Sequence, residues 1–282
     1  MGKILWLASY PKSGNTWLRA FIHNLMLNPA KPADINDMNA LTTGDSLTQW
    51  YRHLDPRPPS AWSTDDMIRM RRGAQLAICA SKPETVIVKT HNALVTIGGD
   101  QIIQMDLTAG AIYVVRNPLD LVLSLADHYG VDIDRAIEIM ADPYNGGLAD
   151  DRIVIEVHNT WSEHVKSWTQ RPHPGLHIVR YEDMLKKPLH TFGGIARFMG
   201  LKPSRQRLDR AIELSSFKSL RAQEDSKGFV EKSPKGSKFF RVGQAGQWKD
   251  KLSPAQIDKI VENHREQMTR FGYWPREMTK AG

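Results

Sequence analysis

Short apolar runs that alternate with helical patterns constrain the fold of this chain more than any other feature. The runs are rich in large apolar or β-branched residues, as is typical of buried strands, and lie at residues 3–8, 86–89, 111–115 and 176–180. Segments with helical apolar spacing follow, at residues 16–27, 119–129 and 189–199. This alternation predicts an α/β fold, a three-layer sandwich in which helices cover both faces of a central parallel sheet.

Less regular stretches separate these units. They are rich in proline, glycine or polar residues and lie at residues 28–63, 142–151 and 222–246. Long irregular segments in a compact domain often form lids or binding loops. A chain of 282 residues with no internal repeat and no clear interdomain linker is expected to form a single domain over residues 1–282.

Composition narrows the class of protein. With 41% hydrophobic and 24% charged residues, the chain is expected to be globular, which excludes a disordered or fibrous class. No apolar run approaches the roughly 20 residues that cross a bilayer, so we expect no integral membrane association. The first residues lack the pattern of a signal peptide, and the single cysteine, Cys79, cannot form an internal disulfide or a multi-cysteine metal site. We therefore expect a cytoplasmic protein.

The charge balance indicates an anionic partner. The 38 lysines and arginines exceed the 31 acidic residues, which gives a formal net charge of +7. A surplus of this size steers anions toward the protein over a long range. This charge fits nucleic acids, acidic lipids, nucleotides and sulfated or phosphorylated small molecules. Only sequence motifs can therefore indicate which anion the protein binds.

The segment between the first predicted strand and helix has the residues of an anion-binding loop. It reads Ser-Tyr-Pro-Lys-Ser-Gly-Asn-Thr-Trp over residues 9–17. Free N–H groups at a helix N-terminus bind phosphate well, and Gly14 lets the backbone approach the anion closely. Lys12 adds a mobile positive charge. An ordinary turn, with Ser13 or Asn15 capping the helix, fits the same residues.

This loop differs from the nucleoside-triphosphate loop G-x-x-x-x-G-K-[ST]. Lys12 precedes Gly14, the first glycine of that motif is missing, and no Ser/Thr follows a Gly-Lys pair to hold magnesium. A nucleotide or metabolite kinase built on the same strand–loop–helix unit therefore stays open as an alternative, but it is disfavoured. A basic nucleic-acid-binding module is a second alternative, although only residues 69–72 form a tight basic cluster.

Two further motifs follow predicted strands. Arg116 comes at the end of one strand, and Ser124 lies about two turns along the next helix, near enough to reach the same anion. A guanidinium can hold a phosphate with two parallel hydrogen bonds. His91 ends another strand, at the edge of the sheet where ligands bind in open α/β folds. An imidazole can accept a proton at neutral pH, so His91 is a candidate general base.

Residues 10–17, Y-P-K-S-G-N-T-W, closely resemble the 5′-phosphosulfate loop, Y-P-K-S-G-T-T-W, of the cytosolic-type sulfotransferases. These enzymes move a sulfuryl group from 3′-phosphoadenosine 5′-phosphosulfate (PAPS) to a hydroxyl or amine, and release 3′-phosphoadenosine 5′-phosphate (PAP). The resemblance implies a P-loop-like phosphosulfate-binding unit and a small-molecule acceptor, with neither a metal nor a nucleic acid. It implies donor contacts from Lys12, Ser13, Gly14, Asn15, Thr16 and Trp17.

Other segments resemble the same family in the same order along the chain. V-R-N-P-L-D resembles its 3′-phosphate motif, which implies that Arg116 and Ser124 hold that phosphate. Y-E-D-M and S-S-F resemble segments beside the adenine, and F-F-R-V-G-Q-A-G-Q-W-K resembles the element that closes over the nucleotide. The further donor-binding residues that these segments imply are Tyr181, Ser216, Phe217, Phe239, Phe240, Arg241 and Gly243. Val242 and Gln247 depart from the family pattern, which has lysine and aspartate there.

The family resemblance also implies a mechanism. In K-T-H, His91 would act as general base for an in-line displacement at sulfur, while Lys12 stabilises the charge on the leaving oxygen. Lys89 would share this charge, and Ser124 would steer Lys12. The acceptor is expected to be lined by residues 28–81, 97–104 and 142–151. The identity of the acceptor stays open, because these segments carry no recognisable pattern. The oligomeric state also stays open: the segment after Trp248 lacks the pattern by which many animal members dimerise, so a dimer of that kind is not expected.

Overall fold

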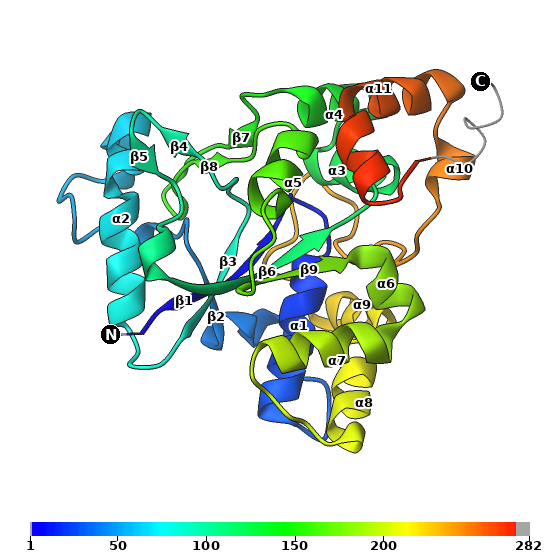
Figure 1. Ribbon diagram of the computed structural model, residues 1–282, viewed down its shortest axis with the longest axis horizontal. Coiled ribbons are helices and arrows are strands. Elements are labelled where there is room, and N and C mark those ends of the chain that lie inside the picture. Colours follow the sequence, from blue (N-terminus) through cyan, green and yellow to red (C-terminus); the bar gives the residue numbers. More distant parts are fainter. Residues whose placement is uncertain (1, 275–282) are drawn as a thin grey trace.

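A five-stranded parallel sheet forms the centre of the computed structural model, which describes residues 2–274 (Figure 1). The strand order is β2-β3-β1-β6-β9. The strands are β1 (Ile4–Ser9), β2 (Thr42–Gly44), β3 (Val86–Thr90), β6 (Thr108–Val115) and β9 (Leu176–Arg180). Neighbouring strands are in register through pairs such as Trp6 with Val88 and Ala111. The predicted parallel sheet is therefore confirmed.

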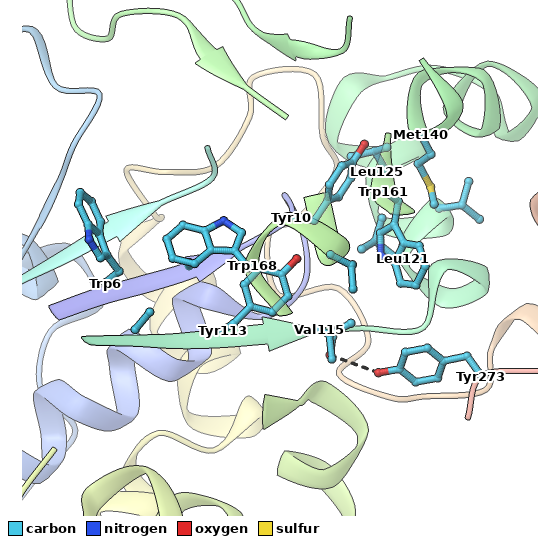
Figure 2. Packing of buried hydrophobic residues seen from close by; sticks show 14 of the residues in the cluster. Trp6, Tyr10, Tyr113, Val115, Leu121, Leu125, Met140, Trp161, Trp168 and Tyr273 are labelled. Carbon is cyan, nitrogen blue, oxygen red and sulfur yellow. Dashed lines mark hydrogen bonds between the residues drawn. The ribbon is translucent and has the colours of Figure 1, made fainter. Parts of the chain in front are cut away.

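Helices cover one face of the sheet through a large aromatic core. Trp6, Val88 and Tyr113 pack on this face with Tyr10, Trp161 and Trp168 (Figure 2). The helices in this layer are α2 (Thr64–Ala80), α3 (Pro118–Tyr129), α4 (Ile133–Ala141), α5 (Trp161–Thr169) and α11 (Pro254–Arg270). Each contributes buried apolar residues to this core, as the helical spacing requires.

The other face of the same strands carries the alternate residues. Leu7, Ile87 and Ile112 point to this side because successive side chains of a strand point to opposite faces. The layer here consists of α1 (Asn15–Leu27), α6 (Tyr181–Lys186), α7 (Pro188–Phe198) and α8 (Arg205–Leu214). Both faces are covered, so the three-layer sandwich is confirmed.

The remaining elements connect these layers, and several of them lie in the segments expected to be irregular. They are the 3-10 turns at Ile35–Ala40, Thr48–Trp50, Pro59–Ala61 and Met105–Leu107, the pair β4 (Thr96–Ile97) with β5 (Asp100–Gln101), the pair β7 (Gly146–Gly147) with β8 (Glu156–Val157), α9 (Phe217–Lys227) and α10 (Trp248–Lys251). No helix within residues 2–274 combines the length and the apolar character needed to cross a membrane.

Several elements differ from the sequence-based expectation, and β6 begins at Thr108, three residues before the predicted run at 111–115. Strand β2 was not predicted, because its residues Thr-Thr-Gly carry no apolar pattern; it forms only by pairing with β3 at the edge of the sheet. Helix α9 continues to Lys227 and so enters the segment 222–246 that was expected to be irregular. Its solvent-facing half is polar, which hides the helical period.

Candidate active site

A cavity of about 750 Å³ lies where the carboxyl ends of β1, β3 and β6 meet. The loop after β1, His91 after β3 and Arg116 after β6 all line it. The carboxyl edge is the place where ligands bind in open α/β sheets, because the loops that leave parallel strands converge there. Residues from the segment 228–247 line the opposite side.

The loop after β1 presents an open helix N-terminus to this cavity. Lys12 and Gly14 both have positive φ angles, of 67° and 106°, and no side chain caps the helix that begins at Asn15. The Asn15 amide points back instead, donating to the Leu7 carbonyl at 2.8 Å. A Cβ on Gly14 would come within 2.7 Å of the Tyr181 ring. The first-turn N–H groups are thus left free for an anion.

Lys12 extends its ammonium group into the cavity. Its Nζ lies 4.1 Å from the centre of the Phe239 ring, which is a cation–π contact. Burial lowers the pKa of Lys12 to about 8, with the positive charge of Arg116 adding to the effect. Lys12 is therefore still mostly charged at neutral pH. An anion bound in the cavity would relieve the repulsion between Lys12 and Arg116.

Arg116 is fixed beside this lysine. Its Nη1 donates to the Lys12 carbonyl oxygen at 3.0 Å, and its guanidinium lies 4.5 Å from the centre of the Tyr181 ring. Its buried Nε has no hydrogen-bond partner among the described residues. Ser124 and Arg241 line the same cavity. A buried donor without a partner is costly, so this cluster is built for an anionic ligand that accepts hydrogen bonds.

Two carboxylates hold the segment 228–247 over the cavity. Glu224 accepts hydrogen bonds from the N–H groups of Phe239 and Phe240 at 2.7 and 2.9 Å. Asp120 accepts from the N–H groups of Gly246 and Trp248 at 2.6 and 3.1 Å. Neither residue has a role that the sequence predicts. Asp120 belongs to the motif V-R-N-P-L-D and could have been found there, whereas nothing in the sequence distinguishes Glu224 from a surface glutamate.

Gly243 lies in this segment where a side chain cannot fit. Its φ angle is +65°, and a Cβ would come within 2.3 Å of the Phe217 ring. Phe217, Phe240 and Val242 line the cavity beside it. The glycine lets the backbone lie against the aromatic ring, so the loop and the start of α9 form one wall.

His91 is held in the tautomer that a general base requires. Its Nδ1 lies 2.8 Å from the Ser9 carbonyl oxygen, and because a carbonyl only accepts, Nδ1 carries the proton. Nε2 therefore bears the free lone pair. Burial, together with the charge of Lys89, lowers the pKa of His91 well below its ordinary value. The ring is neutral at physiological pH and can accept a proton.

A second histidine fixes the backbone of the first. The His164 Nε2 lies 3.0 Å from the His91 carbonyl oxygen, and its Nδ1 lies 2.8 Å from the Tyr113 hydroxyl. The carbonyl requires N–H on Nε2, so the tyrosine hydroxyl donates to Nδ1. Burial lowers the pKa of His164 to about 3, which keeps this ring neutral. The resulting chain ties the end of β3 to α5 and β6.

The structure brings most of the predicted site residues to one cavity. Those that line it are Lys12, Gly14, Asn15, Thr16, Trp17, Lys89, His91, Arg116, Ser124, Tyr181, Phe217, Phe239, Phe240, Arg241 and Gly243. Ser13 and Ser216 do not line it. The Ser13 side chain is buried beneath the loop, and the Ser216 hydroxyl caps α9 by accepting from the Ser219 N–H. Within residues 2–274, no group of three or more His, Cys, Asp or Glu could hold a metal ion.

The predicted acceptor segments contribute unevenly. Residues 28–81 supply Asn39, Gly44 and Leu47, and the loop 142–151 supplies Gly147, Leu148 and Asp150. Residues 97–104 do not line the cavity, because the β4–β5 pair packs beside α2. Tyr51 and Trp62, which belong to the predicted segment 28–81, lie instead in a separate buried cluster.

Two residues at β8 that line the cavity are not predicted from the sequence. Glu156 is the first residue of β8 and His158 follows the strand; both line the cavity, and His158 is 2% exposed. They are placed there by the pairing of β8 with β7 and by the hydrogen bonds of Val157 with Asn92 and Ala93, which are contacts distant in sequence.

Comparisons with known proteins agree with this architecture. Residues 3–272 match the family described as sulfotransferase domain. Sulfotransferase 1B1 of Canis lupus familiaris is 25% identical over 270 residues, which cover 93% of this chain and 82% of that relative. The crystal structure of mouse sulfotransferase SULT7A1 complexed with PAP is 19% identical, with a TM-score of 0.59 and coverage of 94% and 84%. Retinol dehydratase in a complex with retinol and PAP is 20% identical, with a TM-score of 0.64 and coverage of 94% and 81%. Because the family match spans nearly all of the described residues, the chain belongs to the sulfotransferase domain family and is an enzyme of the sulfotransferase type.

Proposed function

We propose that this protein transfers the sulfuryl group of PAPS to a hydroxyl or amine of a small-molecule acceptor, with His91 as general base. The observation that carries the proposal is the position of His91 and Lys12 on one cavity. His91 Nδ1 is hydrogen-bonded to the Ser9 carbonyl, which leaves Nε2 free. The Lys12 ammonium has no anionic partner within 4.0 Å among the described residues. The PAP complexes of the two similar folds support a nucleotide donor.

The residues of the cavity fit a donor with two anionic ends. The open N-terminus of α1 and Lys12 would hold the 5′-phosphosulfate, which supplies an activated sulfuryl group when bound. Arg116, with its unpartnered Nε, and Arg241 would hold the 3′-phosphate together with Ser124. The aromatic rings of Trp17 and Phe217 also line the cavity and would contact the adenine ring of the donor.

His91 and Lys12 then divide the work of the transfer. His91 Nε2 takes the proton of the acceptor hydroxyl as the oxygen–sulfur bond to the acceptor forms. The bond between sulfur and the 5′-phosphate oxygen breaks, and the electron pair stays on that phosphate. Lys12 and the backbone N–H groups of the loop stabilise the developing negative charge, and the Lys89 ammonium adds to this field. The acceptor leaves as a sulfate ester, and the proton stays on His91.

The test is the variant His91→Asn, with His53→Asn as a matched control on the exposed surface. We expect His91→Asn to lower the transfer rate with labelled PAPS by about 10²–10⁴-fold, since general-base catalysis contributes that much. Calorimetry should find PAP binding unchanged in this variant. The control should keep full activity and binding. Normal turnover by His91→Asn would contradict the role of the base, and absence of PAP binding by the unmodified protein would contradict the whole proposal.

A further inference from the structure

Glu156 is a charged residue that the transfer step does not use. It begins β8 and lines the same cavity as His91. Two hydrogen bonds of the Val157 backbone fix β8 beside the segment after His91. The Val157 N–H donates to the Asn92 side chain at 2.7 Å, and the Ala93 N–H donates to the Val157 carbonyl at 2.6 Å. The position of the Glu156 carboxylate relative to the base is therefore set by the sheet-like pairing around it.

The carboxylate is ionised. Burial acts to raise the pKa of Glu156, but the charge of Lys89 and the hydrogen bond from His158 outweigh it and hold the pKa well below its ordinary value. The His158 Nε2 lies 3.3 Å from Glu156 Oε2. Since an ionised carboxylate only accepts, His158 donates from Nε2. The His158 ring in turn lies 6.5 Å from the His91 ring, measured between their centres.

The Glu156 carboxylate makes one hydrogen bond within the described residues, the 3.3 Å contact of its Oε2 with His158. No lysine or arginine nitrogen of residues 2–274 comes within 4.0 Å of it. Its side chain is 14% exposed and lines the cavity, and Oε1 is not fully buried. Oε1 can therefore accept a hydrogen bond from a donor on a molecule in the cavity, and hydrogen bonds to charged groups are the stronger ones.

The structure leaves room for that donor. Gly147 lines the cavity opposite Glu156 on β7, and a Cβ there would lie 3.3 Å from Glu156 Oε2. A glycine at this position keeps the carboxylate accessible. Apolar side chains of Leu47, Leu148 and Ile153 also line the cavity; Leu148 follows Gly147, and Leu47 pairs with Ile153. An acceptor molecule in the cavity therefore has apolar side chains, the His91 imidazole and the open Glu156 oxygen as possible contacts.

We propose that Glu156 selects acceptors that carry a second hydrogen-bond donor close to the hydroxyl that is sulfated. This inference rests on the proposed function, because it assigns a substrate class to the same cavity. His91 Nε2 accepts the proton of the reacting hydroxyl, and Glu156 accepts from the neighbouring donor. That donor is either a second hydroxyl or a protonated amine, since both chemistries satisfy a carboxylate.

Three matched phenols test the proposal: 2-(hydroxymethyl)phenol, 2-(aminomethyl)phenol and 2-ethylphenol. The first two carry a neutral and a cationic donor, and the third has an ethyl group of the same size without a donor. We expect kcat/KM for at least one donor-bearing phenol to exceed that for 2-ethylphenol by about ten- to a hundredfold, the range of a hydrogen bond to a charged group. A larger value for the amine identifies a cationic acceptor, and a larger value for the alcohol identifies a neutral one.

The variant Glu156→Gln keeps the shape and removes the charge. We expect it to lower the preference for the donor-bearing phenols about tenfold, into the roughly two- to tenfold range of a neutral hydrogen bond. Asp151→Asn is the matched control, because it removes a negative charge from the exposed loop outside the cavity. It should keep the preference of the unmodified protein.

Several results would overturn the proposal. One is that the unmodified protein uses all three phenols equally, or that it binds PAP and turns over none of them. Another is that in Glu156→Gln the preference persists, or the rate falls equally for all three phenols. Calorimetry with PAP separates this failure from failure of the proposed function. If PAP does not bind, the donor site is wrong; if PAP binds and the preference is absent, only the role of Glu156 is wrong.

Discussion

The charge of Lys12 should control donor binding near pH 8. In this cavity burial and the neighbouring Arg116 lower the pKa of Lys12 to about 8, from an ordinary lysine value of 10.5. The ammonium form carries the attraction for the 5′-phosphate. That attraction is therefore present below pH 8 and is lost as the pH rises through 8, well before an ordinary lysine would lose its proton.

The size of the effect follows from the fraction of protonated Lys12. With a pKa of about 8, the protonated fraction is about nine-tenths at pH 7, one-half at pH 8 and one-tenth at pH 9. If PAP binds mainly to the protonated form, its dissociation constant should rise about tenfold between pH 7 and pH 9. A lysine with an ordinary pKa would change the dissociation constant by less than about 10% over the same range.

Isothermal calorimetry with PAP between pH 7 and pH 9.5 measures this dependence without the chemical step. Lys12→Arg is the informative variant, because a guanidinium stays charged throughout this range. Its dissociation constant should not change with pH. Lys12→Met should bind weakly at every pH. A constant affinity in the unmodified protein, or the same pH dependence in Lys12→Arg, would refute the assignment of this charge to Lys12.

Two substitutions test how the cavity is built. Asp120→Asn replaces one of the two acceptor oxygens that hold the N–H groups of Gly246 and Trp248, so urea unfolding should show a loss of about 1–3 kcal/mol and calorimetry a weaker affinity for PAP. An unchanged unfolding free energy with normal binding would show that the carboxylate does not hold the loop. Gly14→Ala adds a Cβ 2.7 Å from the Tyr181 ring at a φ of +106°, so PAP binding should be lost or strongly reduced; normal affinity would show that the loop relaxes without cost.

The fold was largely predictable because its signals are local. The strand-like runs at 86–89 and 176–180 correspond to β3 and β9 within one residue. The run in β3 is apolar because both faces of that strand are buried, whereas β9 is a partly exposed edge strand whose signal is its β-branched residues. Strand β2 was not predictable in this way. Its three residues carry no pattern of their own, and they form a strand only because the edge of β3 offers hydrogen-bond partners.

The donor half of the candidate site was also predictable, because its residues are contiguous. The loop at 10–17 has an unusual order of lysine, glycine and polar residues, and Arg116 and His91 each follow a strand in recognisable motifs. Ser13 and Ser216 show the limit of that reasoning. Sequence fixes which residues stand in a motif, whereas the direction of each side chain depends on packing, which turned these two away from the cavity.

By itself, the chain's order of residues determined the alternating layers and the chemistry of the donor loop, because both depend on neighbours along the sequence. Tertiary structure alone decided the rest. It lowered the pKa of Lys12 by burial beside Arg116, placed Glu156 near His91 through the pairing of β8, and bound the segment 228–247 to Asp120. Those effects arise between residues far apart in sequence, whose distances and shared loss of water exist only once the chain has folded.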